Sequence, residues 1–207
     1  MDLTQTATEP VKVIDAEYTV ESGHKVPQPV IHLFCRNESG EFRQIDVEGF
    51  RPYFMISLDE FIEKTSDVLN DRHVLAVEAD LSTVEFDDDG NLTRGSGDTD
   101  EIASKLESVS NATEVYHNSD TFQTLEDDNL VKVYTIEPSH VGKIRDHWDQ
   151  TWEADIPFVR RFLISSGIHL GASVPTENDR VRYENWPGHS TSDTAITEIH
   201  PCEAPEV

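Results

Sequence analysis

The apolar residues of this chain recur in short runs, and most runs alternate with polar residues as half-buried strands do. Alternation with a period of two residues predicts β-strands, and turn-forming residues separate several of the runs. The prolines mark boundaries as well: Pro52 within the fourth run indicates an edge strand or a bulge, because proline cannot donate to the sheet. The predicted strand regions are 11–20, 30–36, 41–47, 50–57, 73–86 and 129–138.

Other segments have the spacing of helices. A helix is predicted over 58–70, where Ser57 can cap it, and another over 140–150, where Ser139 can do the same. A third follows over 157–165, with Pro157 in its first turn. The segment 87–127 is polar, with one weak helix over 101–109. It is expected to form a surface excursion rather than part of the core.

These elements predict one α+β domain, a mixed or antiparallel sheet with packed helices, over 11–170. The predicted polar insertion is about 87–127. Residues 1–10 are expected to be a flexible tail, and 171–207 a linker or tail towards a missing domain. Two strand-like pieces interrupt that last segment, at 180–186 and 195–201.

The charge of the chain changes how its partners are inferred. The chain has 41 acidic and 16 basic residues, which give it a formal net charge of −25. The recurrent apolar runs argue against disorder, so the acid is expected on the surface, as in proteins of salt-loving organisms. At about 1 M salt the Debye length is only about 3 Å, so self-repulsion is screened and long-range attraction to phosphate is weak for any protein. Net charge therefore does not exclude a DNA partner.

The chain shows no signal architecture and no membrane-length apolar run, and a soluble, cytoplasmic protein is expected. Its two cysteines are far apart and predict neither a disulfide framework nor a zinc site, and Cys35 is expected to be a buried free thiol.

Three local patterns suggest metal chemistry and are better explained otherwise. The sequence Gly97-Asp98-Thr99-Asp100 matches a polymerase carboxylate turn, but its flanks are polar, so Asp98 or Thr99 is expected to cap a helix. The acidic stretch 85–90 half-matches a calcium loop, and a hairpin turn is the preferred interpretation. His140 and His147 lack a third ligand and are expected at the surface or in caps.

The segment 153–165, EADIPFVRRFLIS, differs from its acidic surroundings. Ile156, Phe158 and Phe162 have helical spacing, while Arg160 and Arg161 point to neighbouring but distinct sides of the helix. An amphipathic core helix with two snorkelling arginines is one interpretation. A second cluster of arginine and aromatic residues, FRPYF at 50–54, favours a flat-walled pocket, because Arg stacks on rings and stays charged.

The order of several motifs resembles the amino-terminal domain of archaeal family B DNA polymerases. The motifs are VIDAEY, VIHLFCR, FRPYF, VYTIEPSHVGKIR and EADIPFVRRFLI, and the resemblance covers about 11–165. In that family, as the resemblance implies, this domain binds single-stranded template and captures uracil ahead of synthesis. The acidic composition suggests a haloarchaeal member.

Carried over by motif, the resemblance implies a base pocket of residues from several strands and one helix. Arg51 and Arg160 would contact phosphate outside it. A flipped base needs a snug, largely apolar slot with backbone groups that read its edge. The implied pocket residues are Tyr18, Pro52, Tyr53, Val141, Ile156, Pro157, Phe158 and Arg161.

Departures from the family limit the expected activity. Ser165 stands where the family has Asp, and neither exonuclease nor palm carboxylates follow. Alone, the chain is expected to be non-catalytic and without cofactor, with Mg²⁺ bound only in the family's other domains. The expected partners are template DNA and polymerase or exonuclease domains, in cis or in trans. Two alternatives remain: a docking module without base recognition, and an unrelated acidic α+β domain.

Overall fold

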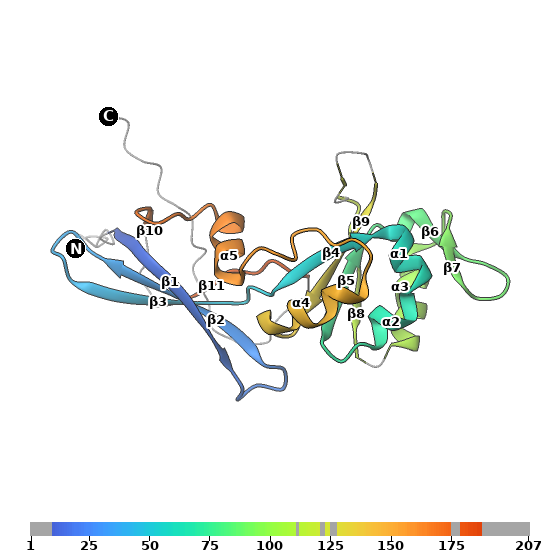
Figure 1. Cartoon of the computed structure of the whole chain (residues 1–207), viewed down its shortest axis with the longest axis horizontal. Helices are drawn as coiled ribbons and strands as arrows, with labels where there is room; N and C mark the ends of the chain where they lie inside the picture. The colour runs from blue at the N-terminus through green and yellow to red at the C-terminus, as the bar shows by residue number, and fades with distance from the viewer. Residues whose placement is uncertain (1–9, 111, 121–122, 125–127, 175–178, 188–207) are drawn as a thin grey trace, which may run out of the picture. The chain divides into compact units, whose positions relative to one another are not determined.

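The computed structural model of the chain describes residues 10–110, 112–120, 123–124, 128–174 and 179–187 (Figure 1). These residues divide into two compact units. The first contains the described residues up to Phe50 and those of 156–185; the second contains the described residues of 51–155 with 186–187. Each unit has its own mixed sheet, and the second carries most of the helices. The predicted α+β class is confirmed.

The sheet of the first unit is built on a three-stranded antiparallel meander, as the alternating runs predict. In its middle strand Ile31, Leu33 and Cys35 are buried, while His32 and Phe34 point to the other face. Cys35 is a buried free thiol, as expected, and burial raises its pKa to about 11. The strands, in sheet order, are β10 (Ser173–Val174), β1 (Val11–Glu21), β2 (Gln28–Arg36), β3 (Phe42–Glu48) and β11 (Arg180–Arg182).

Helix α5 (Phe158–Ser166) packs in the first unit, beside the sheet (Figure 1). Pro157 immediately precedes it as the N-cap residue, close to the predicted start. The helix ends at Gly167, whose φ of 69° lies in the left-handed region that glycine adopts without strain.

The sheet of the second unit separates an apolar face from a polar and aromatic one. Phe54, Val77 and Val133 point into the apolar core of the unit, which the helices help to form. The edge strand of this sheet begins just after Pro52, so the edge position is confirmed. The strands, in sheet order, are β4 (Tyr53–Ser57), β9 (Leu130–Thr135), β5 (Val74–Ala79) and β8 (Glu114–His117).

The helix predicted over 58–70 is in fact two helices, α1 (Leu58–Glu63) and α2 (Thr65–Asn70). Ser57 caps the first, as predicted: its hydroxyl accepts a hydrogen bond from the Glu60 N–H at 3.1 Å. The break follows from Thr65, whose hydroxyl donates to the carbonyl oxygens of Phe61 and Ile62. A side chain that binds the preceding turn competes with helix continuation.

The helix predicted over 140–150 begins earlier and is shorter. It is α4 (Pro138–Ile144), followed by a 3₁₀ turn, η2 (Arg145–His147). The predicted cap at Ser139 is wrong, because Pro138 opens the helix and Glu137 is the N-cap residue. Proline is favoured at this first position, since its fixed φ is already helical.

The polar segment 87–127 contributes to the core of the second unit, so its expected surface position is wrong in part. It contains β7 (Leu92–Arg94), which forms a hairpin with β6 (Val84–Phe86), then α3 (Thr99–Val109) and β8. Four of its apolar residues are buried and belong to the core cluster: Leu92, Ile102, Leu106 and Val115. That the segment is an insertion stays a prediction.

The ends of the chain are described only in part. Of the predicted tail at 1–10, only Pro10 lies within the described residues, and the strand-like piece at 195–201 lies outside them. From the predicted linker, β10 and β11 join the first sheet, and β11 lies in the strand-like piece at 180–186. Among the described residues, no helix has the length and apolarity needed to cross a membrane.

Candidate nucleic-acid interface

The predicted pocket residues divide between the two units. Tyr18, Ile156, Pro157, Phe158 and Arg161 belong to the first, and so does Arg160. The second unit contains Arg51, Pro52, Tyr53 and Val141. The two sets are described in turn.

Tyr18 and Phe158 are brought together within the first unit. Tyr18 pairs with the buried Ile31 of β2, on the face of the sheet that carries the core. Its ring meets that of Phe158 edge-on, with centroids 5.2 Å apart, and the residue is 41% exposed. Phe158 is buried. Tyr18 therefore presents a half-open aromatic surface supported from below.

Phe158 belongs to an aromatic cluster that fixes its position. Phe50 lies 5.5 Å from Phe158 and 5.4 Å from Phe162 between ring centroids. Tyr183 closes the cluster at 5.6 Å from Phe162, and its hydroxyl donates to the Ser165 carbonyl oxygen at 2.7 Å. Burial raises the pKa of Tyr183. We refer to Tyr18, Phe50, Phe158, Phe162 and Tyr183 as the aromatic cluster.

The two arginines of α5 point to different sides of the helix, as expected from their adjacent positions. Arg161 is only 7% exposed and shares the buried side with Phe158 and Phe162, whereas Arg160 is exposed. The Arg161 N–H donates to the Pro157 carbonyl oxygen at 2.9 Å, which closes the first turn. At this helix start, Pro157 is exposed and Ile156 partly buried.

Arg51 is buried in the second unit, which is unfavourable to the predicted phosphate contact. It is 6% exposed, its guanidinium lies 5.6 Å from the centroid of the Trp186 ring, and it donates to the Ile136 carbonyl oxygen at 3.4 Å. Burial lowers its pKa to about 10. An arginine held in this way is less available to an external strand than Arg160.

Tyr53 lies on the polar and aromatic face of the second sheet. The Lys132 ammonium is 4.2 Å from the centroid of its ring, and Tyr134 meets the ring at 5.9 Å. Pro52 is buried, and its carbonyl oxygen accepts a hydrogen bond from the Thr135 N–H at 2.8 Å. Val141, by contrast, is partly buried and packs against the apolar core.

Sequence reasoning missed the polar network around Tyr53. The Tyr134 hydroxyl donates to Glu78 at 2.6 Å, and Asn118 donates to the other carboxylate oxygen at 2.6 Å. Glu78 and Lys132 are cross-strand partners, and both are largely buried. The signal available in the sequence was the alternation of 129–138, which places Lys132 and Tyr134 on one face.

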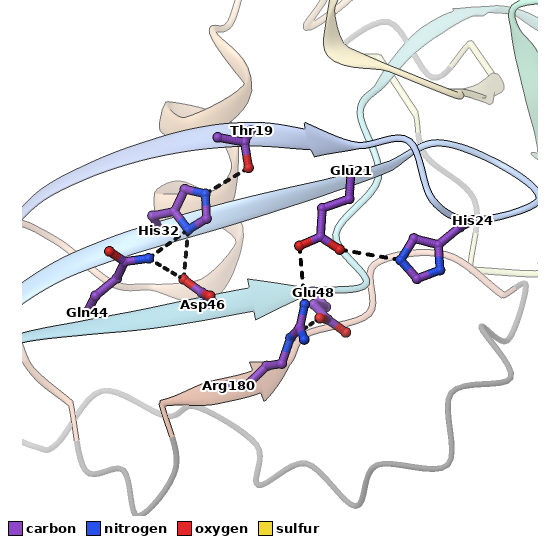
Figure 2. Close-up of polar contacts among 8 residues, drawn as sticks. All are labelled: Thr19, Glu21, His24, His32, Gln44, Asp46, Glu48 and Arg180. Carbon is purple, nitrogen blue, oxygen red and sulfur yellow. Dashed lines mark hydrogen bonds and ion pairs between the residues drawn. The ribbon is translucent and has the colours of Figure 1, made fainter.

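A second polar network, also missed, lies on the first sheet (Figure 2). His32 Nε2 lies 2.8 Å from the Thr19 hydroxyl, and its Nδ1 lies 2.7 Å from Asp46. Gln44 donates to Asp46 at 2.8 Å. Burial raises the pKa of Asp46, but the hydrogen bonds from Gln44 and His32 outweigh it and hold that pKa below its ordinary value.

Two of the three patterns that suggested metal sites have the alternative roles expected for them. Asp98 caps α3 by accepting from the N–H groups of Asp100 and Glu101. The Asp87 carboxylate accepts from Asn91 in the turn between β6 and β7, which lowers its pKa. Of the two histidines, His147 is exposed, as expected, whereas His140 is partly buried, with its ring centroid 4.5 Å from that of His73.

Comparisons with known proteins agree on one class of relative, although no protein-family model matches the chain. The chain is 26% identical over 172 residues to the DNA polymerase of Archaeoglobus fulgidus and 26% identical over 175 residues to that of Pyrococcus glycovorans. It is 27% identical over 175 residues to the DNA polymerase of Thermococcus kodakarensis.

Each alignment covers 81% of this chain, but only 17% of the first two relatives and 8% of the third. The solved family B DNA polymerase of the hyperthermophilic archaeon Pyrobaculum calidifontis matches with a TM-score of 0.47 and 21% identity, over 81% of this chain and 18% of that one. The chain is thus similar to a limited part of archaeal DNA polymerases.

Proposed function

We propose that this chain is a non-catalytic, polymerase-related domain that binds single-stranded template DNA and recognises uracil ahead of synthesis. The similarity to archaeal DNA polymerases over 81% of the chain supports the polymerase relationship. Because the chain spans 17% of those relatives, their whole activity is assigned here to other domains, in cis or in trans, and these are its proposed partners. A salt-loving source is proposed from the net charge of −25.

The observation that carries the proposal is the contact between Tyr18 and Phe158. An unpaired base requires a flat, largely apolar surface, and aromatic side chains provide it for any base. Tyr18 supplies a half-exposed ring that a buried ring holds in place. The start of α5, at Ile156 and Pro157, would supply the nearby backbone groups, and Arg161 would brace the wall. For Pro52, Tyr53 and Val141 the same role is proposed from the resemblance.

The proposed selectivity follows from the chemistry of the bases. Thymine carries a methyl group that a snug slot rejects, and purines are too large. Cytosine exchanges the donor and acceptor at the edge that uracil presents, so it would leave buried polar groups unpaired. Arg160, exposed on α5, is the proposed phosphate contact.

The rival function is a docking module that has lost base recognition. The decisive measurement compares binding of single-stranded DNA with one uracil against its thymine counterpart in about 2–3 M KCl, where surface charge is screened. The variants are Tyr18→Ala, Tyr53→Ala and Arg161→Ala. Ile164→Ala is the matched control, because Ile164 lies on α5 and is 57% exposed.

The proposal expects a uracil preference that the three site variants lose and Ile164→Ala keeps. Arg161 is buried, so circular dichroism must show that its variant is folded before its binding is interpreted. Equal affinity of the folded wild-type protein for the two DNAs would favour the docking module instead.

A further inference from the structure

One end of the first sheet carries a row of cationic and aromatic side chains on the face opposite its core. Lys12, Arg36 and Phe42 are direct cross-strand neighbours, on β1, β2 and β3 respectively. The buried neighbours Val13 and Cys35 point to the core, so these three residues point away from it. Since adjacent strands lie about 4.8 Å apart, the row is about 10 Å long.

Phe42 is an open aromatic surface rather than part of the core. It is 60% exposed, and its ring stacks on that of Phe34, with centroids 5.9 Å apart and an interplanar angle of 25°. Phe34 is the next residue on the same face of β2, and so it supports Phe42 from one side. A supported, exposed ring is the feature on which unpaired bases stack in single-strand binding proteins.

The cations of the row are available to an anion. Lys12 and Arg36 are exposed and form no ion pair with any residue that the structure describes. Arg43, by contrast, donates to Asp179 at 2.5 Å, and Arg180 pairs with glutamates of the same sheet (Figure 2). The chain has a net charge of −25, so two exposed cations in a row with an exposed ring are unusual on its surface. Lys12, Arg36 and Phe42 are together complementary to a polyanion that carries flat bases.

The neighbouring carboxylates define where such a strand would run. A hollow of about 350 Å³ beside Phe42 is lined by Glu41, Arg43 and Asp179 among others. Arg43 pairs with Asp179, and Glu41 would repel phosphate. Asp15 lies opposite Phe34, farther along the strands. The path that avoids all three carboxylates runs across the strand ends, along the row itself.

We propose that Lys12, Arg36 and Phe42 form a binding site for single-stranded nucleic acid that does not depend on base identity. A base stacks on Phe42, and Lys12 and Arg36 bind the flanking phosphates. None of these residues belongs to the predicted uracil pocket, so the site adds a second contact with the strand. It rests on the proposed function only in that both require single-stranded DNA as the ligand.

The test uses the full chain and a fluorescein-labelled twelve-residue thymidine oligonucleotide, which contains no uracil. Phe42→Leu keeps an apolar side chain but removes the ring, whereas Phe42→Trp keeps a ring. We expect Phe42→Leu to weaken binding about fivefold or more, as the loss of one base–aromatic stack does, and Phe42→Trp to retain it. An equal effect of both variants, or none, would overturn the stacking role.

The cationic role has its own readout, the dependence of affinity on salt between about 0.5 and 2 M KCl. Each phosphate contact adds about 0.7 to the slope of log affinity against log salt for single strands. The double variant Lys12→Ala, Arg36→Ala should therefore lower the slope by about 1.4. Lys25→Ala, an exposed lysine in the turn between β1 and β2, is the control and should leave it unchanged. A slope unaltered by the double variant would exclude these phosphate contacts.

The outcomes also separate this site from the uracil pocket. If the ratio of uracil to thymine affinity is unchanged in Phe42→Leu while both affinities fall, both sites stand. Binding that depends on Phe42 but shows no uracil preference would leave the row and remove the pocket. A uracil preference with unchanged affinity in Phe42→Leu would support the uracil pocket and exclude the row as a nucleic-acid site. A polypeptide partner would then be the better explanation for the row.

Discussion

The ring of Tyr18 rests edge-on against that of Phe158, with centroids 5.2 Å apart. One of these residues is half-exposed and the other buried, so a surface aromatic residue is coupled to the core of the first unit. The pair joins a strand near the start of the chain to a helix near its end. Changes at the two positions should therefore have different effects on stability and on binding.

Phe158→Ala should lower the free energy of unfolding by about 3–5 kcal/mol, because it removes a buried ring and leaves a cavity among Tyr18, Phe50 and Phe162. Denaturant unfolding at constant KCl measures this loss. The control Ile164→Ala, on the exposed side of α5, should change it by no more than about 0.5 kcal/mol. Similar losses in the two variants would contradict the assignment of Phe158 to the core.

Asp46→Asn should make the stability of the protein less dependent on pH in acid. Hydrogen bonds from Gln44 and His32 hold the pKa of Asp46 below its ordinary value in the folded state. Stability from this carboxylate is therefore present above its unfolded pKa of about 3.9 and is lost as the pH falls through the lower, folded value. Unfolding midpoints from pH 7 to pH 2 measure the effect.

The control for Asp46 is Asp149→Asn, an exposed aspartate of the second unit. It should leave the acid limb of the curve unchanged. An acid limb of Asp46→Asn that superimposes on that of the wild-type protein would show that the His32 network does not stabilise the charged form.

The sequence predicted the three strands of the first meander well because their burial alternates, as Ile31, Leu33 and Cys35 show. The prediction of burial failed where apolar residues are isolated in a polar segment. Ile102 and Leu106 are the buried residues of α3, a largely exposed helix. Local chemistry accounts for the other boundary errors, since Thr65 binds the preceding turn and Pro138 starts its helix earlier.

For the candidate site, the motifs indicated Tyr18, Phe158 and Tyr53 but not the polar network around Tyr53. Lys132, Tyr134 and Glu78 come together only through the register of β5 with β9, which no local pattern specifies. The burial of Arg51 was equally hidden, because it depends on Trp186, a residue far along the chain.

Tyr134→Phe should destabilise the second unit by about 1–3 kcal/mol, because it leaves a largely buried carboxylate of Glu78 with one donor fewer. Burial and the Glu78 carboxylate raise the pKa of the Tyr134 phenol, which favours the protonated hydroxyl that donates this bond. Denaturant unfolding provides the measurement. Tyr116→Phe is the control: its hydroxyl donates to Glu114 in an exposed contact, and its loss should cost little. Equal costs would argue against the importance of the buried bond.

His140→Gln should reduce the loss of stability that occurs as the pH falls below about 6.5. Burial and the adjacent His73 lower the pKa of His140, while Glu137 and Asp71 oppose the shift and Lys143 adds to it. The unfolded chain therefore takes up this proton first as the pH falls below about 6.5, and the free energy of unfolding decreases until the pH passes the lowered, folded pKa.

The matched control for this change is His147→Gln, because His147 is exposed in η2. Its unfolding midpoints should follow the wild-type curve between pH 8 and pH 5, whereas those of His140→Gln should fall less steeply. This difference arises because burial and the ring of His73, whose centroid is 4.5 Å away, disfavour the charged form of His140. Parallel curves for all three proteins would mean that His140 accepts its proton as readily in the folded state as in the unfolded chain.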